Sequence, residues 1–171
     1  MERLLGTPLR VRPATVDDHP ALARLQRDLD AIHARVQPGF FRASVDGPGE
    51  SQRTLEWVRA ALGDPHAALI VADEEGVVVG AIRLRLWDSP EDPTVTPARR
   101  VNVESLVVAS TARRRGIGRA LMAEADRWAR ARGATQVVLT VWEGNDTAER
   151  FYRALGFGDA SHVLARDLGK R

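Results

Sequence analysis

The spacing of apolar and polar residues along the chain predicts a mixed α/β fold. Residues 9–12 alternate between the two classes and indicate a short strand. After Thr15, an acid three residues later gives the spacing of a capping box, and leucines then recur every three or four positions, as in a helix. Residues 37–49 are rich in glycine and proline and predict a loop. A second helix is expected from about residue 51 to the Gly-Asp-Pro stop at 63–65.

The middle of the chain predicts strands. Residues 68–71 and 77–86 flank an Asp-Glu-Glu-Gly turn, so two antiparallel strands are expected there. A polar loop over residues 88–97 leads to another strand at 101–108. No repeat, low-complexity tract or linker separates a second unit, so residues 1–171 are expected to form one domain.

Helices and strands alternate in the C-terminal part of the chain. The pattern predicts a helix over about 116–130, a strand at 136–141, a helix over 147–155 and a final strand near 162–165. The order is β-α-α-β-β-β-α-β-α-β, with one further strand whose position the pattern leaves open.

Composition excludes several kinds of chemistry. The chain has no cysteine, so disulfides, thiolate metal sites and a cysteine nucleophile are absent. Its four histidines lack ligand spacing, and no metal site is predicted. No apolar run approaches the roughly 20 residues that span a bilayer, and residues 1–10 do not resemble a secretion signal. We therefore expect a cytoplasmic protein without a membrane partner.

Positive charge gathers in the C-terminal part of the chain, although the net charge is only +2. An anionic ligand is expected there, and an ordinary solvated face is the alternative. The segment that follows the apolar strand at 101–108 and opens the next helix has the glycines and cations of an anion-binding turn. It consists of Arg113, Arg114, Arg115, Gly116, Ile117, Gly118 and Arg119.

Other phosphate-binding loops do not fit this segment. A Walker A loop needs Gly-Lys-Ser/Thr, and a dinucleotide fingerprint needs a third glycine where Leu121 or Met122 stands. A kinase glycine loop needs a lysine on the next strand, and the one lysine is Lys170. Binding of nucleic acid by the arginines is the alternative, but no aromatic residues are interleaved with them. No nucleic-acid partner is expected.

Two motifs together resemble the GNAT acetyltransferase superfamily. The first is Arg113-x-x-Gly116-x-Gly118 after a strand. The second, about thirty residues later, is Asn-x-x-Ala-x-x-Phe-Tyr-x-x-Leu-Gly-Phe over residues 145–157. The resemblance is close over residues 101–157, and the elements before it follow the family's order.

The resemblance implies a mixed, mostly antiparallel sheet of about seven strands flanked by four helices. It also implies that the sheet opens between the strands at 101–108 and 136–141, and that acetyl-CoA enters this split. Amides of residues 114–119 would hold the pyrophosphate, and Asn145 would bind the pantetheine arm. A homodimer is a common arrangement of such domains. The remaining implied cofactor residues are Leu106, Val107, Val108, Ala148 and Phe151.

The same resemblance implies roles for two titratable residues. An acceptor amine must lose a proton before it attacks a thioester, and the departing thiolate must be stabilised. Tyr152 would donate a proton to the thiolate, although a packed aromatic is the alternative. Glu104 interrupts an apolar strand and is the candidate base, acting through a water, with an arginine-paired residue as the alternative. Glu143, Asp146 and His33 are weaker candidates.

The sequence is compatible with several kinds of acceptor. Phe40, Phe41 and Trp87 stand near acids and suit a cationic amine, or else form a small hydrophobic core. Arg83 and Arg85 alternate with apolar residues and can instead receive a carboxylate. Small amines, aminoglycosides, amino acids and peptide N-termini all fit. A non-catalytic acyl-CoA binding module is the alternative function.

Overall fold

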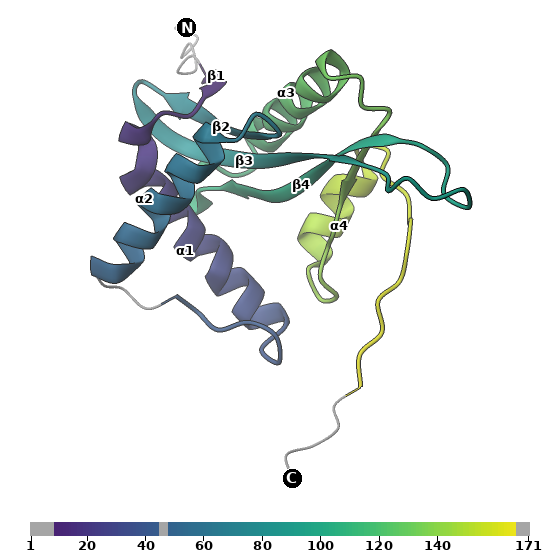
Figure 1. Ribbon diagram of the computed structural model, residues 1–171. Helices are drawn as coiled ribbons and strands as arrows, with labels where there is room; N and C mark the ends of the chain where they lie inside the picture. Colours follow the sequence, from purple (N-terminus) through teal and green to yellow (C-terminus); the bar gives the residue numbers. More distant parts are fainter. Residues whose placement is uncertain (1–8, 45–47, 167–171) are drawn as a thin grey trace, which may run out of the picture.

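The computed structural model describes residues 9–44 and 48–166, which form a five-stranded sheet with helices on both faces (Figure 1). The strands lie in the order β1-β2-β3-β4-β5; β1 to β4 are antiparallel, and β5 runs parallel to β4. The strands are β1 (Leu9–Pro13), β2 (Ala67–Glu74), β3 (Val77–Asp88), β4 (Arg99–Val108) and β5 (Gln136–Leu139). The α-helices are α1 (His19–Val36), α2 (Pro48–Gly63), α3 (Ile117–Ala131) and α4 (Asp146–Arg153). The expected mixed α/β class and four helices are confirmed.

The sheet is buried on both faces because alternate residues of its central strands point to opposite sides. Ile70 of β2 and Ile82 of β3 pack with α3 in one cluster. Val71 and Ala81, one residue away from them, pack with α1 and α2 in the other. Figure 1 shows α1 and α2 together on one side, with α3 and α4 on the other.

The predicted capping box joins the start of α1 to the sheet. The Thr15 N–H donates to Asp18 Oδ2 at 2.7 Å. Arg12 of β1 donates to both oxygens of Asp18 at 2.8 Å and to Asp73 of β2 at 3.1 Å. One arginine therefore ties two strands to the first turn before the helix. Asp18 is only 8% exposed, so this is a largely desolvated ion pair.

A bulge interrupts β4 at the point where the sheet opens. Arg83 pairs with Ser105 and Leu84 pairs with Val103, so Glu104 is an extra residue without a ladder partner on β3. On its other side, β4 pairs with β5 only over residues 100–103. Among the described residues, the stretch 104–108 therefore has a strand neighbour on one side alone. The implied split between these two strands is present.

The expected number of strands differs from the structure, because the described residues form five strands rather than about seven. The predicted final strand near residues 162–165 is not formed, and the described chain after α4 contains no strand. Val163 and Leu164 are 89% and 94% exposed. Two adjacent apolar residues among polar neighbours have no alternating face to bury, and the hydrophobic effect gives them little reason to pair with β5. The further strand, whose position the sequence pattern left open, is likewise not formed among the described residues.

Candidate active site

The bulge in β4 turns two consecutive side chains to the same face of the sheet. Before it, Val101 and Val103 pack on the α3 side; after it, Leu106 does so. The alternation has shifted by one residue, so Glu104 and Ser105 both face α1 and α2. Both line a pocket of about 380 Å³ on that face.

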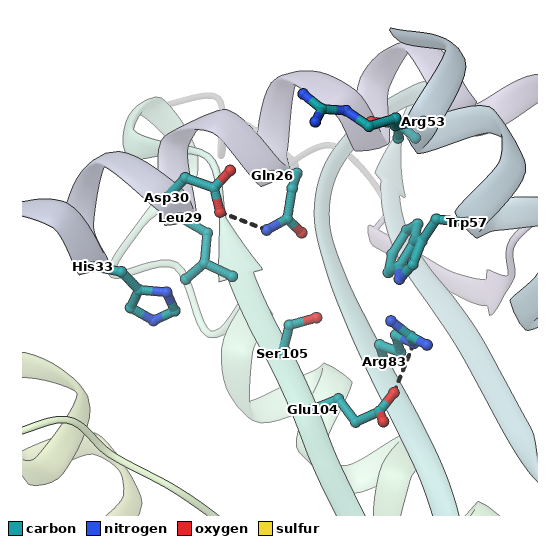
Figure 2. A pocket seen from close by; sticks show the side chains of 10 residues that line it. Gln26, Leu29, Asp30, His33, Arg53, Trp57, Arg83, Glu104 and Ser105 are labelled. Carbon is teal, nitrogen blue, oxygen red and sulfur yellow. Dashed lines mark hydrogen bonds and ion pairs between the residues drawn. The ribbon is translucent and has the colours of Figure 1, made fainter. Parts of the chain in front are cut away.

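Three parts of the chain form the walls of this pocket (Figure 2). One wall is α1, another is α2, and the third is the adjacent part of β3 and β4. The lining residues are Gln26, Leu29, Asp30, His33, Arg53, Thr54, Trp57, Arg83, Glu104 and Ser105. The pocket thus carries positive and negative side chains beside the opening of the sheet.

Glu104 contacts two arginines of the neighbouring strand. Its Oε2 lies 2.7 Å from Arg83 Nε, and its Oε1 accepts a hydrogen bond from Arg85 Nε at 2.9 Å. Arg85 also donates to Asp64 at 2.8 Å. Burial is the main effect on Arg83 and lowers its pKa, while the charge of Glu104 opposes that shift. The arginine pairing expected as the alternative for Glu104 is present, and its role as a base stays a prediction.

The α1 wall carries an acid and a histidine. Asp30 accepts hydrogen bonds from Gln26 Nε2 at 2.7 Å and from the hydroxyl of Ser44. Burial lowers the pKa of His33, and the nearby charge of Asp30 opposes this shift. His33 is therefore largely neutral at pH 7.

An aromatic cluster borders the pocket beyond His33. Phe41 lies 4.9 Å from both His33 and Trp142, and Phe40 lies 5.3 Å from Trp142, measured between ring centroids. Phe40 and Phe41, expected as part of an acceptor wall, thus lie next to the pocket lining without belonging to it. Trp87 lies away from the pocket, with Arg100 over its ring at 5.4 Å.

The turn before α3 has the conformation expected of an anion-binding site. Arg114 and Gly116 have positive φ angles of 65° and 83°, so the chain bends sharply before Ile117. The first N–H groups of a helix have no partner within the helix and carry its positive dipole end. In the described part of the chain, the exposed Arg114 and Arg119 have no ion pair. Backbone donors and free cations gather here.

The neighbouring arginines have structural contacts of their own. Arg113 Nε donates to the carbonyl oxygen of Val108 at 3.1 Å, and Arg115 Nη2 donates to Glu74 at 2.8 Å. These contacts fix the turn to the end of β4 and to β2. The three arginines of the motif therefore differ: two hold the turn in place, and Arg114 projects from it.

The two sequence motifs meet where α4 packs on the start of α3. A Cβ on Gly118 would lie 3.1 Å from Phe151 Cζ, so a larger residue would displace that ring. Asn145 caps α4, and its Oδ1 accepts the N–H of Ala148 at 3.3 Å. The cap uses only the oxygen of Asn145, which leaves its NH₂ group to donate.

Tyr152 is a phenol held in an apolar setting. The centroid of its ring lies 5.1 Å from the ring centroid of Phe151 and 5.7 Å from that of Phe157. Burial raises the pKa of Tyr152 to about 12, so the phenol keeps its proton at neutral pH. Among the described residues its hydroxyl has no hydrogen-bond partner. Such a group can donate a proton or a hydrogen bond to an anion.

Sequence reasoning missed most of the polar residues of the pocket. Gln26 and Asp30 were missed, although they follow at helical spacing with His33, a weaker candidate of the sequence, beside the buried leucines of α1. The other missed residues are Arg53, Thr54 and Ser105. No group of metal-ligating side chains occurs within residues 9–44 and 48–166, and no helix there is long and apolar enough to cross a membrane.

The sheet is split beside a glycine-containing turn and a polar pocket. Sequence comparison identifies the family of the chain. The model of the acetyltransferase (GNAT) family matches residues 29–157. The chain belongs to this family. It is 28% identical over 108 residues to an aminoglycoside N(6')-acetyltransferase type 1 from Klebsiella aerogenes, which covers 63% of this chain and 70% of that protein.

Solved structures share the fold. A tetramutant of the BH1408 protein from Bacillus halodurans superposes with a TM-score of 0.83 and 24% identity, covering 93% of this chain and 99% of that one. AAC(6')-Iy in complex with a bisubstrate analogue of CoA superposes with a TM-score of 0.70 and 20% identity, covering 96% and 99%. These similarities support the fold.

Proposed function

We propose that this protein transfers the acetyl group of acetyl-CoA to the amine of a small molecule. One observation carries the proposal: the open edge of β4 at residues 104–108 lies between the turn before α3 and the pocket under α1. An extended thioester substrate along that edge would have its anionic end at the turn and its acyl group near the pocket. Family membership supports the reaction class.

The cofactor side would rely mainly on backbone groups. The edge of β4 at Leu106, Val107 and Val108 would pair with the pantetheine arm, as a further strand pairs with a sheet edge. The first amides of α3 would bind the pyrophosphate, with charge from Arg114 and Arg119. The NH₂ group of Asn145 would also donate to the pantetheine arm.

The acceptor nitrogen would attack the thioester carbon directly. A carbon–nitrogen bond forms, the carbon–sulfur bond breaks, and the sulfur leaves as a thiolate. Tyr152 would supply the proton that the thiolate takes up, since its phenol is protonated and has no hydrogen-bond partner among the described residues. Glu104 would remove the amine proton through a water, because each carboxylate oxygen keeps a second lone pair beside its arginine contact.

Tyr152→Phe tests the assignment, because the change removes the hydroxyl and keeps the ring. We expect kcat to fall by roughly 10²- to 10⁴-fold with acetyl-CoA affinity unchanged. Turnover is measured as release of free CoA with a thiol reagent, and the lack of cysteine removes protein background. Calorimetry gives the affinity, and a melting curve checks the fold.

Two results would contradict the proposal at different levels. An unchanged kcat in Tyr152→Phe would remove the residue from the mechanism and leave the reaction class. No CoA release by the wild-type protein with any amine of a broad panel, despite saturable acetyl-CoA binding, would instead favour a non-catalytic acyl-CoA binding module.

A further inference from the structure

Arg83 presents an incompletely used guanidinium to the pocket. Its Nε is close to Glu104 but is not aligned for a hydrogen bond, and its Cζ lies 4.8 Å from the ring of Trp57. Among the described residues, its terminal nitrogens Nη1 and Nη2 have no partner. Arg85 differs, since its Nε donates to Glu104 and its Nη1 to Asp64. A planar pair of N–H groups held on an aromatic ring is the donor set that binds a carboxylate.

Asp30 supplies the opposite charge from the α1 wall. Its two oxygens accept from Gln26 and Ser44, which are neutral donors, and no cation of the described residues forms an ion pair with it. The adjacent His33 is largely neutral at pH 7 because burial lowers its pKa. Figure 2 shows Asp30 on one side of the pocket and Arg83 on the other. An ammonium group facing Asp30 would give that carboxylate its missing cation.

The charged groups that line the pocket balance in sign. Asp30 and Glu104 are negative, and Arg53 and Arg83 are positive. A polycationic acceptor such as an aminoglycoside would meet cations as well as anions on such a wall. A molecule with one ammonium and one carboxylate would match it group by group.

We therefore propose that the acceptor is an amino acid or a similar small amine that carries a carboxylate. Its carboxylate would bind the terminal nitrogens of Arg83, and its amine would lie between Asp30 and Glu104, beside the open edge of β4. This inference rests on the proposed function and specifies its substrate class. It departs from the acceptor that the name of the Klebsiella aerogenes relative gives for that protein.

The test compares acceptors that differ only in the carboxylate. CoA release is measured with a panel of free amino acids, with the primary amide of each one, and with kanamycin. We expect kcat/KM for at least one acid to exceed that of its amide by about tenfold or more, since a hydrogen-bonded carboxylate would become a neutral amide. In Arg83→Gln this preference should fall by about tenfold or more, so that the ratio of acid to amide approaches one.

Arg85→Gln is the matched control. It also removes an arginine contact of Glu104, but Arg85 does not line the pocket. Its ratio of acid to amide kcat/KM should stay near that of the wild type even if both values fall. Equal loss of the ratio in both variants would mean that the arginines act only by positioning Glu104, and this would overturn the inference.

The remaining outcomes separate the inference from the proposed function. Faster acetylation of amides or of kanamycin than of every acid would overturn the inference and keep the acetyltransferase. If no acceptor turns over, the proposed function fails, and titration of the same pairs in the presence of free CoA decides the substrate class. Tighter binding of an acid than of its amide would then support the inference, and no difference would refute it.

Discussion

The turn before α3 and the pocket under α1 lie at the same split of the sheet, but they are built from different groups. The turn offers backbone N–H groups, and its shape depends on the conformations of Arg114 and Gly116 within one short segment. The pocket offers charged side chains from two helices and two strands, among them Asp30 and Arg83. A backbone site tolerates changes of charge nearby and fails when its shape changes. A side-chain site is sensitive to changes of charge and tolerates small changes of backbone shape.

The largest effect is expected when the shape of the backbone site changes. In Gly118→Val the new side chain would press on Phe151, 3.1 Å from the added Cβ, and would cover the first amides of α3. Loss of two hydrogen bonds to a charged group should weaken acetyl-CoA binding by roughly 100-fold or more. Calorimetry measures the affinity. Gly158→Val is the control, because Gly158 has open space around it; equal affinities of the two variants would contradict a backbone-built site.

A smaller effect is expected when only charge is removed from the same site. The double change Arg114→Gln and Arg119→Gln should weaken acetyl-CoA binding by about tenfold at low salt, because exposed charge pairs contribute roughly 1 kcal/mol or less each. The loss should shrink as ionic strength rises, since salt screens exposed charges. Arg130→Gln, near the other end of α3, should leave the affinity unchanged. A loss that salt does not alter would argue against a screened charge effect.

The smallest effect on the turn and on the pocket is expected when the ion pair at the start of α1 is removed. Hydrogen bonds from Arg12 hold the pKa of Asp18 below its ordinary value of 3.8. Ionised Asp18 therefore stabilises the fold above about pH 3.8, and this stability is lost as the pH falls through the lower folded-state pKa. Asp18→Asn should lower the free energy of unfolding at pH 7 by about 1–3 kcal/mol, with acetyl-CoA affinity unchanged.

Denaturant melts at pH 7 and below pH 4 check this expectation. The difference between wild type and Asp18→Asn should shrink in the more acidic solution. Asp17→Asn is the matched control, since this neighbouring acid is exposed and outside the Arg12 network; it should change stability little. A difference of constant size across the pH range would show that the charge of Asp18 is not the cause.

The features of the fold that were predicted correctly depend on neighbours in the sequence. The turn at Gly76, the capping box at Thr15 and the left-handed Gly116 each need only a few consecutive residues. The final strand was predicted wrongly for a related reason. Val163 and Leu164 have the composition of a strand, but pairing needs a second strand and a surface to cover, which the local pattern does not report.

The chain's own sequence determined the order of its elements as far as α4, the glycine-containing turn before α3 and the motif that contains Tyr152, because helix periodicity, glycine conformations and caps act over a few residues. Only the tertiary structure decided which charged side chains meet. The bulge at Glu104 depends on the register of β4 against β3, and this register points Glu104 and Ser105 toward α1. Packing of α1 on the sheet then brings Asp30 opposite Arg83. Contacts between residues so far apart in sequence follow from how the buried faces pack, which no local pattern encodes.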